Sequence, residues 1–172
     1  MFIGAENIIS PLGNSAKETF LRMKNGESSI KYKDGLFLST FSPLQDEILP
    51  LLIDSISDSL SFVNETILLK SKTLLIVSTT KGEINSINSR INNSHLSYLS
   101  EKIKNFFNCI DKGIVVSTAC VSGLQSLIIA NDMINHNHYD NVIICGGDLA
   151  SQFVIEGFKS FYALSDAHCS PF

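Results

Sequence analysis

The residue with the clearest chemical potential is Cys120, which stands where a strand-like pattern gives way to a helical one. The β-forming residues of 114–118 precede it, and from Gly123 onward the apolar spacing is helical. A cysteine at such a turn lies beside the first unpaired N–H groups of the helix, whose partial positive charge favours the thiolate. These groups can also receive the oxyanion that forms when sulfur attacks a carbonyl. The pattern predicts a nucleophile, and a buried structural cysteine is the alternative.

Small residues flank this cysteine, and glycines also stand at the ends of two other apolar segments. Three of them flank the sulfur and would let a substrate approach the backbone closely: Ala119, Ser122 and Gly123. Glycines that follow two other runs are interpreted as close-approach positions, structural first and substrate-lining second: Gly82, Gly146 and Gly147.

Two other groups of residues are weaker candidates for a functional site than Cys120. His136, His138 and Asp140 have the spacing of a metal-binding motif, but they fall at a helix-to-strand turn where polar residues are expected, so we predict no metal site. A cysteine hydrolase using His168 would need that histidine near Cys120, and no local signature of such an enzyme is present. We interpret the other cysteines as packing residues or bystanders: Cys109, Cys145 and Cys169.

The helix predicted after Cys120 is apolar around most of its circumference. Between residues 121 and 134 the only charge is Asp132, and Ile129 lies well off the face formed by Leu124, Leu127 and Ile128. A helix of this kind is expected to be buried on most of its surface. It therefore needs cover on two sides.

The remaining elements are predicted from periodicity and turn residues. Ser15, with Glu18 three residues on, forms a capping box for a helix over 16–24 that ends at Asn25-Gly26. Its inward residues are predicted to be Phe20, Leu21 and Met23. Further helices are predicted over 46–69, with Pro50 requiring a start near Leu49, and over 94–109. Strands are predicted over 2–9, 36–41, 73–78, 113–118, 142–147 and 158–164. Strands alternating with helices predict a single α/β domain with a mainly parallel sheet.

Composition excludes several classes of protein. The 172 residues are 44% hydrophobic and only 17% charged, with a net charge of -4, which argues against a nucleic-acid binder. No apolar run approaches the ~18 residues that span a bilayer, and the N-terminus lacks a secretory signal. The four cysteines form no C-x-x-C pair, so we expect a reducing cytoplasm.

Residues 117–124 resemble the nucleophile segment of β-ketoacyl synthases, the thiolase-fold condensing enzymes of fatty-acid and polyketide synthesis. Four further segments resemble that family in the same order: 8–15, 21–30, 140–147, and 157–165 with 169–172. The resemblance covers nearly all of residues 1–172 and is weakest over 31–72 and 83–111. It implies a five-stranded, mainly parallel sheet covered by helices on both faces, which is half of a five-layered αβαβα enzyme.

The resemblance also implies a reaction. An acyl group arrives as a phosphopantetheine thioester on an acyl carrier protein and passes to Cys120, whose backbone N–H is one oxyanion donor. A malonyl thioester then loses carbon dioxide, and its carbanion attacks the acyl-enzyme. The resemblance implies no bound cofactor, and it implies pairing as a homodimer or as a heterodimer with a similar subunit.

The chain departs from the family in one respect. The two active-site histidines of these synthases lie in the C-terminal half, and none of the four histidines here occupies those positions. We therefore expect the nucleophile-bearing half of a duplicated fold, from a truncated or naturally short chain, inactive alone in condensation. The second half would cover the apolar helix. The alternative is a non-catalytic synthase-like partner of the chain-length-factor type.

Overall fold

The computed structural model describes residues 2–33, 35–41, 47–63, 72–85, 95–108, 110–165 and 167. It is an α/β protein that divides into two compact units. The larger unit comprises Met1–Asn7 and Glu47–Asp148, and the smaller comprises Ile8–Asp46 and Leu149–Phe172. Each unit is described by itself.

The larger unit is built on a parallel sheet in the order β4-β3-β5. Its strands are β3 (Thr73–Ser78), β4 (Lys112–Val116) and β5 (Asn141–Gly146). The central strand β3 is buried along its whole length, as a continuous apolar run predicts for a strand covered on both faces. In its register Ile76 lies opposite Ile114 on one side and Ile144 on the other.

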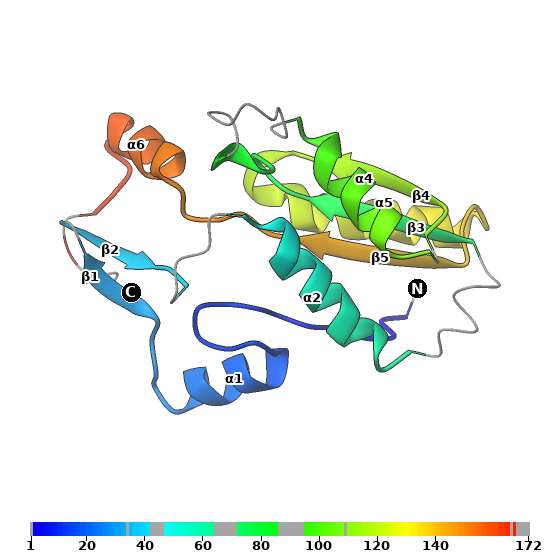
Figure 1. Cartoon of the computed structure of the whole chain (residues 1–172), viewed down its shortest axis with the longest axis horizontal. Coiled ribbons are helices and arrows are strands. Elements are labelled where there is room, and N and C mark those ends of the chain that lie inside the picture. The colour runs from blue at the N-terminus through cyan, green and yellow to red at the C-terminus, as the bar shows by residue number, and fades with distance from the viewer. Residues whose placement is uncertain are drawn as a thin grey trace. The chain divides into compact units, whose positions relative to one another are not determined.

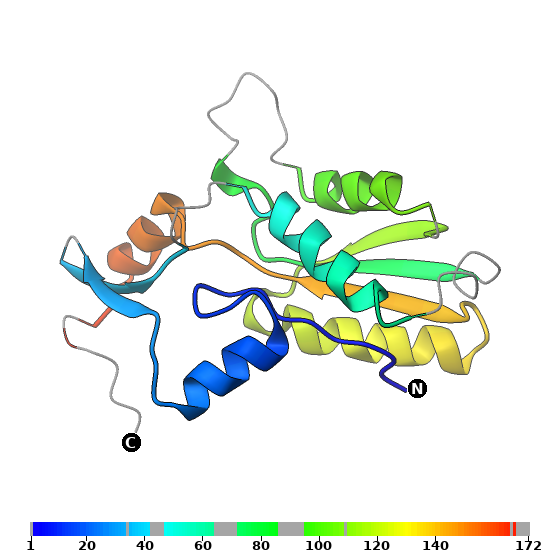
Figure 2. The same cartoon turned by 60° about the horizontal axis from the view of Figure 1, so that its bottom comes forward.

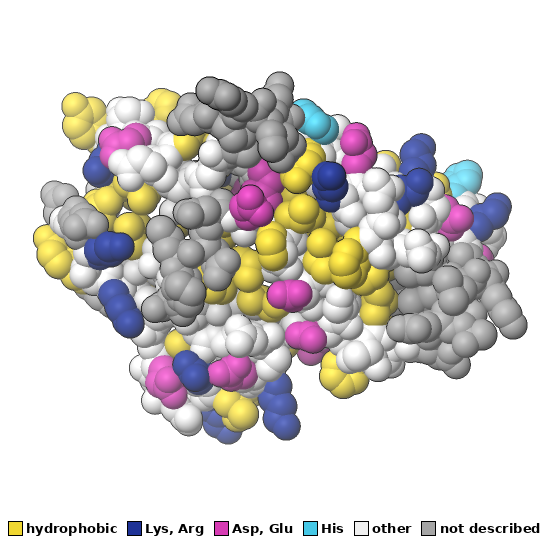
Figure 3. Space-filling model, viewed as in Figure 1, with side chains coloured by type: hydrophobic (Ala, Val, Ile, Leu, Met, Phe, Trp, Pro, Cys, Tyr) yellow, Lys and Arg dark blue, Asp and Glu magenta, His cyan; other side chains and the backbone are white. Residues whose placement is uncertain are grey.

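Helices cover both faces of this sheet (Figures 1 and 2). One face carries α2 (Leu49–Leu60) and α4 (Ser97–Phe106). Leu99 and Ile103 of α4 are 0% exposed, and Leu52 and Ile56 of α2 are also buried. Seen from outside, this face shows apolar side chains with acidic groups among them over α2 and α4 (Figure 3).

The opposite face carries α5 (Ser122–Asn135), which has the predicted span but different burial. Its fully buried positions are the small residues Ser122, Ser126 and Ala130, and Ile129 and Met133 pack partly buried against the core beside them. Large apolar residues are exposed instead: Val121 48%, Leu124 59%, Leu127 42% and Ile128 49%. The prediction that this helix is buried around most of its circumference is therefore wrong for this chain, because the sheet covers only one side of it.

The bounds of the other two central helices follow from local signals. Pro50 occupies the first turn of α2, where its missing N–H costs nothing, so the predicted start near Leu49 is confirmed. The helix predicted over 46–69 is too long, because α2 ends at Leu60 and residues 61–63 form a turn; residues 64–69 lie outside the described residues. The helix predicted over 94–109 is also too long, because residues 95–96 and 107–108 are not helical; residues 94 and 109 lie outside the described residues. In the described part of the chain, no helix has the length and apolar character required to traverse a bilayer.

The smaller unit contains α1 (Ala16–Lys24), α6 (Gln152–Ser160) and an antiparallel hairpin of β1 (Ile30–Lys33) and β2 (Leu36–Ser39). The span of α1 and its cap are confirmed, since the Glu18 N–H donates to Ser15 Oγ at 3.1 Å. The Glu18 carboxylate accepts the Asn14 N–H at 2.9 Å. The predicted inward side chains are wrong, because all three are exposed and Thr19 is the buried residue of α1: Phe20, Leu21 and Met23.

The predicted five-stranded sheet is wrong. The described residues contain three parallel strands and a separate two-stranded hairpin. Residues 2–9 form no strand, and an isolated bridge between Ser10 and Gly13 follows them. Residues 158–164, predicted as a strand, are the end of α6 and the turn after it. The Ser151 hydroxyl accepts the Val154 N–H and caps that helix, so local capping decides against a strand whose residues are largely exposed.

Candidate functional site

The carboxyl ends of the three parallel strands bring the predicted site residues to one edge of the sheet. The chain leaves β3 through residues 79–83 towards α4 on one face, and it leaves β4 through residues 117–121 towards α5 on the other. Because β3 and β4 are adjacent, their connections diverge at a topological switch point. In open α/β sheets, ligands bind outside the carboxyl ends of the strands at such a point. Cys120 lies there.

Cys120 is held in a tight turn between β4 and α5. It is the middle residue of a short 3-10 turn, Ala119–Val121, and it is exposed. Ala119 has a φ of 52°, a left-handed conformation that costs a non-glycine residue roughly 1–2 kcal/mol. This strained backbone conformation belongs to the turn in which the Cys120 sulfur is exposed. The predicted arrangement of strand, cysteine turn and helix is confirmed.

The Ser122 side chain holds this turn together. Its hydroxyl accepts the Thr118 N–H at 2.9 Å and donates to the Ala119 carbonyl at 2.6 Å. Ser122 is buried, and Ser126 Oγ donates to its carbonyl at 2.9 Å one turn later in α5. Both donor and acceptor capacity of the Ser122 hydroxyl is thus used within the turn. We assign Ser122 a turn-holding role beside the predicted substrate-lining one.

The predicted close-approach glycines differ in what they meet. A Cβ on Gly146 would lie 3.0 Å from the Ser78 carbonyl oxygen, and one on Gly147 would lie 3.1 Å from Ile48 Cδ1. At Gly146 and Gly147 the atoms that lie against the backbone therefore belong to the protein itself, namely to Ser78 and Ile48. A Cβ on Gly123 would meet nothing within 4 Å among the described residues, so packing does not explain that glycine.

A hydrogen-bond network joins the ends of β3 and β5, and sequence reasoning missed it. Asp148, just after the paired glycines, accepts hydrogen bonds from the loop that follows β3. Glu83, at the end of that loop, accepts the Ile48 and Leu49 N–H groups at 3.2 and 2.7 Å and so caps α2. Burial raises the pKa of the Glu83 carboxyl, against the lowering effect of those two bonds. The signal in the sequence was an acidic residue just beyond each of two buried strands.

The two described cysteines have opposite environments. Cys145 is buried in β5, and burial raises the pKa of its thiol to about 12. A thiol with that pKa is protonated at neutral pH and unreactive. Cys120 is exposed at the sheet edge. Cys109, Cys169 and His168 lie outside the described residues.

The residues with metal-like spacing have other partners. His136 Nδ1 lies 2.8 Å from the Asp132 carbonyl oxygen, and the rings of His136 and His138 are stacked with centroids 6.2 Å apart. The Asp140 carboxylate accepts the Lys72 N–H at 2.8 Å. Within the described residues, no group of three or more His, Cys, Asp or Glu side chains is arranged to hold a metal ion.

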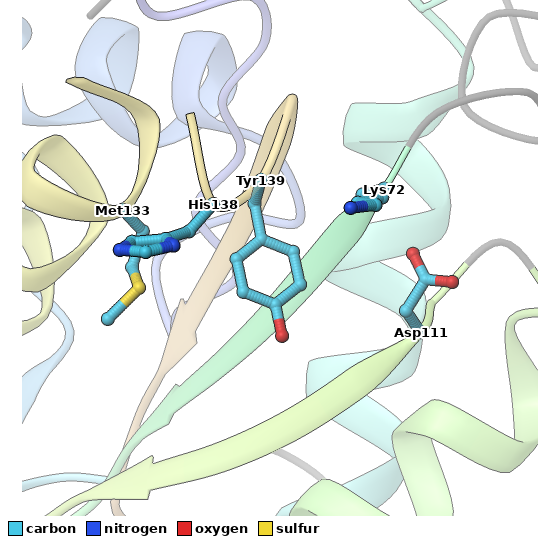
Figure 4. A pocket seen from close by; sticks show the side chains of 5 residues that line it. All are labelled: Lys72, Asp111, Met133, His138 and Tyr139. Carbon is cyan, nitrogen blue, oxygen red and sulfur yellow. The ribbon is translucent and has the colours of Figure 1, made fainter. Parts of the chain in front are cut away.

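A shallow pocket of about 530 Å³ lies at the opposite, amino edge of the sheet (Figure 4). It is lined by Lys72, Asp111, Met133, His138 and Tyr139. The Asp111 carboxylate accepts the Thr73 N–H at 2.6 Å, so it serves to fix the start of β3. Cys120 follows the other end of β4, and we therefore place the candidate chemistry at the carboxyl edge and away from this pocket. The sequence analysis did not predict this pocket. Polar residues just before each strand, such as Lys72, Asp111 and His138, could have indicated it.

Comparison of the chain with models of protein families and with curated proteins gives no match.

Proposed function

We propose that Cys120 is the nucleophile of an acyl-transfer enzyme and that this chain is the nucleophile-bearing half of a β-ketoacyl synthase-like condensing enzyme. The observation that carries the proposal is an exposed cysteine in a strained strand-to-helix turn at the switch point of a parallel sheet. The resemblance of residues 117–124 to the nucleophile segment of that family gives the turn its reaction. The proposed setting is the cytoplasm, in fatty-acid, polyketide or polyene synthesis.

The chemistry begins at the sulfur. The Cys120 thiol gives its proton to water and its thiolate attacks the carbonyl carbon of an acyl thioester. A new carbon–sulfur bond forms, the bond from the acyl carbon to the carrier sulfur breaks, and the carrier thiolate takes up a proton from water as it leaves. The oxyanion formed in between needs backbone donors. By the resemblance, the Cys120 backbone N–H is one of these donors.

The condensation step needs groups that the resemblance assigns to a C-terminal half. The histidines that promote loss of carbon dioxide from a malonyl thioester belong to that half in the family. We therefore expect this chain alone to accept an acyl group on Cys120 without extending it. Its natural acyl donor would be an acyl carrier protein, and its partner a second synthase-like subunit.

The outer face of α5 supports a five-layered assembly. Several of its exposed residues are large and apolar, whereas its fully buried positions are small and only Ile129 and Met133 add partly buried apolar contacts to the core. A helix of this composition suits the middle layer of a larger protein. The proposed C-terminal half, packing on α5 from the side away from the sheet, would bury Leu124 and Ile128.

The same face also fits the alternative of a non-catalytic, chain-length-factor-type partner, because a subunit contact needs no sulfur chemistry. Acylation separates the two. A purely structural partner has no need of an exposed thiol in a strained turn, whereas an acyl-transfer enzyme does.

The test is mass spectrometry of the chain after incubation with an octanoyl thioester of N-acetylcysteamine. We expect one octanoyl adduct, located on Cys120 and lost in Cys120→Ser. Cys145 serves as an internal control, because its buried, protonated thiol should stay unmodified. A folded chain that gains no adduct, or gains it equally on other cysteines, would contradict the catalytic proposal.

A further inference from the structure

The carboxylate of Asp148 collects donors from the loop that follows the neighbouring strand. Oδ1 accepts the Thr79 hydroxyl at 2.9 Å and the Lys81 N–H at 3.3 Å. Both carboxylate oxygens lie 3.1 Å from the Thr80 nitrogen. Asp148 thus ties the end of β5 to three consecutive residues of the loop after β3, although about seventy positions separate them in sequence.

The same loop is tied to the strand that leads to Cys120. The Thr79 N–H donates to the carbonyl of Val116, the last residue of β4, at 3.2 Å. Thr79 is 1% exposed, and its hydroxyl also accepts the Gly82 N–H at 2.9 Å. Residues 79–82 are therefore fixed between the ends of β4 and β5.

This position makes the loop one wall of the switch point, with the cysteine turn as the other. The loop leaves β3 towards one face of the sheet, and the turn leaves β4 towards the other. Lys81 brings a cation to this wall, where its Nζ donates to Thr80 Oγ1. A substrate that reaches Cys120 at the switch point has to fit against this loop.

We infer that Asp148 is a positioning residue for acyl transfer to Cys120, acting through the 79–82 loop that its carboxylate holds. The inference rests on the proposed function. Without the carboxylate, the Thr80 N–H and the Thr79 hydroxyl lose this acceptor, and the Lys81 N–H keeps only its bond of 3.4 Å to Thr79 Oγ1. The loop is then free to move towards or away from the sulfur. The loop then no longer orients a bulky acyl thioester at Cys120, whereas a small alkylating reagent reaches the exposed sulfur as before.

Asp140 provides a matched control. It is an exposed aspartate whose carboxylate also accepts a backbone N–H beside β3, that of Lys72 at 2.8 Å, but it lies at the amino edge. Removing it should disturb the sheet to a comparable extent without touching the wall beside Cys120.

The experiment compares Asp148→Ala, Asp148→Asn and Asp140→Ala in the full chain. For each variant, mass spectrometry follows octanoylation of Cys120 by octanoyl N-acetylcysteamine and, separately, its alkylation by iodoacetamide. We expect Asp148→Ala to slow octanoylation about tenfold or more while alkylation changes less than about twofold. Asp148→Asn keeps an acceptor oxygen and should stay within about threefold of the wild type. Asp140→Ala should octanoylate at the wild-type rate.

Amide hydrogen exchange at residues 80–82 gives a readout that does not depend on catalysis. Protection there should fall in Asp148→Ala and persist in Asp148→Asn and Asp140→Ala. The inference is overturned if Asp148→Ala octanoylates normally, if alkylation falls in parallel, or if Asp140→Ala is equally slow. If the wild type is alkylated but never octanoylated, the proposed function fails, and the exchange data still report whether Asp148 holds the loop.

Discussion

The two faces of the parallel sheet are covered in opposite ways. On the α4 face, two large apolar side chains of the helix are fully buried: Leu99 and Ile103. On the α5 face, the fully buried positions are small, Ile129 and Met133 pack only partly buried against the core, and four large apolar side chains are exposed: Val121, Leu124, Leu127 and Ile128. The α4 face is a completed layer, whereas α5 has the composition of a layer that packs on two sides. This difference is the reason for proposing that a further layer packs on α5.

The turn that carries Cys120 belongs to the extended side. Ser122, the first of the small residues buried between α5 and the sheet, also fixes the cysteine turn. The packing of α5 on the sheet and the conformation of the cysteine turn therefore depend on the same residue. The buried residues of α4 cover the other face of β3. Four substitutions test this contrast.

The largest expected effect is on the completed face. Leu99→Ala should lower the free energy of unfolding by about 2–5 kcal/mol, because it leaves a cavity in a side-chain layer that is fully buried. Urea denaturation followed by circular dichroism measures it. The control is Leu124→Ala on the outer face of α5, which should change the same quantity by about 0.5 kcal/mol or less. Equal losses in the two variants would remove the distinction between the faces.

The next effect concerns the close seam between α5 and the sheet. Ser126→Leu should destabilise the chain by about 1–3 kcal/mol, because a large side chain has no space at a fully buried position. Ser126→Ala, which only removes the hydroxyl bond to the Ser122 carbonyl, should cost about 1 kcal/mol. Thermal or urea unfolding of both variants tests this. A Leu at this position that stabilises the chain would mean that α5 does not lie close to the sheet.

A pH-dependent effect is expected from Glu83, which caps α2 on the completed face. Burial raises the pKa of its carboxyl in the folded chain above the unfolded value. The folded state therefore binds the proton more tightly, and stability falls as pH rises from the unfolded pKa through the folded one. Compared with Glu83→Gln, the wild type should lose stability as pH rises over the range that begins at the ordinary glutamate pKa of 4.5. Parallel stability curves for the two proteins over that range would contradict the assignment.

The smallest effect on folding should come from the outer face of α5. Leu127→Gln is expected to change the free energy of unfolding by about 0.5 kcal/mol or less, since the side chain is already partly in water. It should nevertheless reduce self-association, because an exposed apolar face favours contact with other molecules. Sedimentation velocity at increasing concentration measures this. A loss of stability comparable to that of Leu99→Ala would show that α5 is buried in the isolated chain.

Much of the fold was predictable because its signals are local. Ser15 and Glu18 specify the start of α1, Pro50 fixes the start of α2, and the continuous apolar run of 73–78 gives a doubly covered strand. The failures share a cause. Residues 158–164 contain β-forming side chains, but a strand exists only when another strand pairs with it, and here the capped helix α6 forms instead.

The inward faces of helices show the same limit. The period of α1 and α5 could be read from the sequence, yet the exposure of Phe20 and Leu124 could not. Periodicity gives the position of an apolar stripe, and only the surrounding elements decide whether that stripe is covered.

The candidate site divides in the same way. The sequence by itself determined a cysteine at a strand-to-helix turn, because strand, turn and helix are encoded within some twenty adjacent residues. Only the tertiary structure decided that Ser122 locks this turn, that Asp148 holds the opposing loop and that Glu83 caps α2. The contacts of Asp148 and Glu83 join residues far apart in the chain. The contact of Ser122 is local, but it depends on the direction in which the hydroxyl group points. Hydrogen bonds form wherever folding brings donors and acceptors within about 3 Å, and one-dimensional spacing carries no record of that approach.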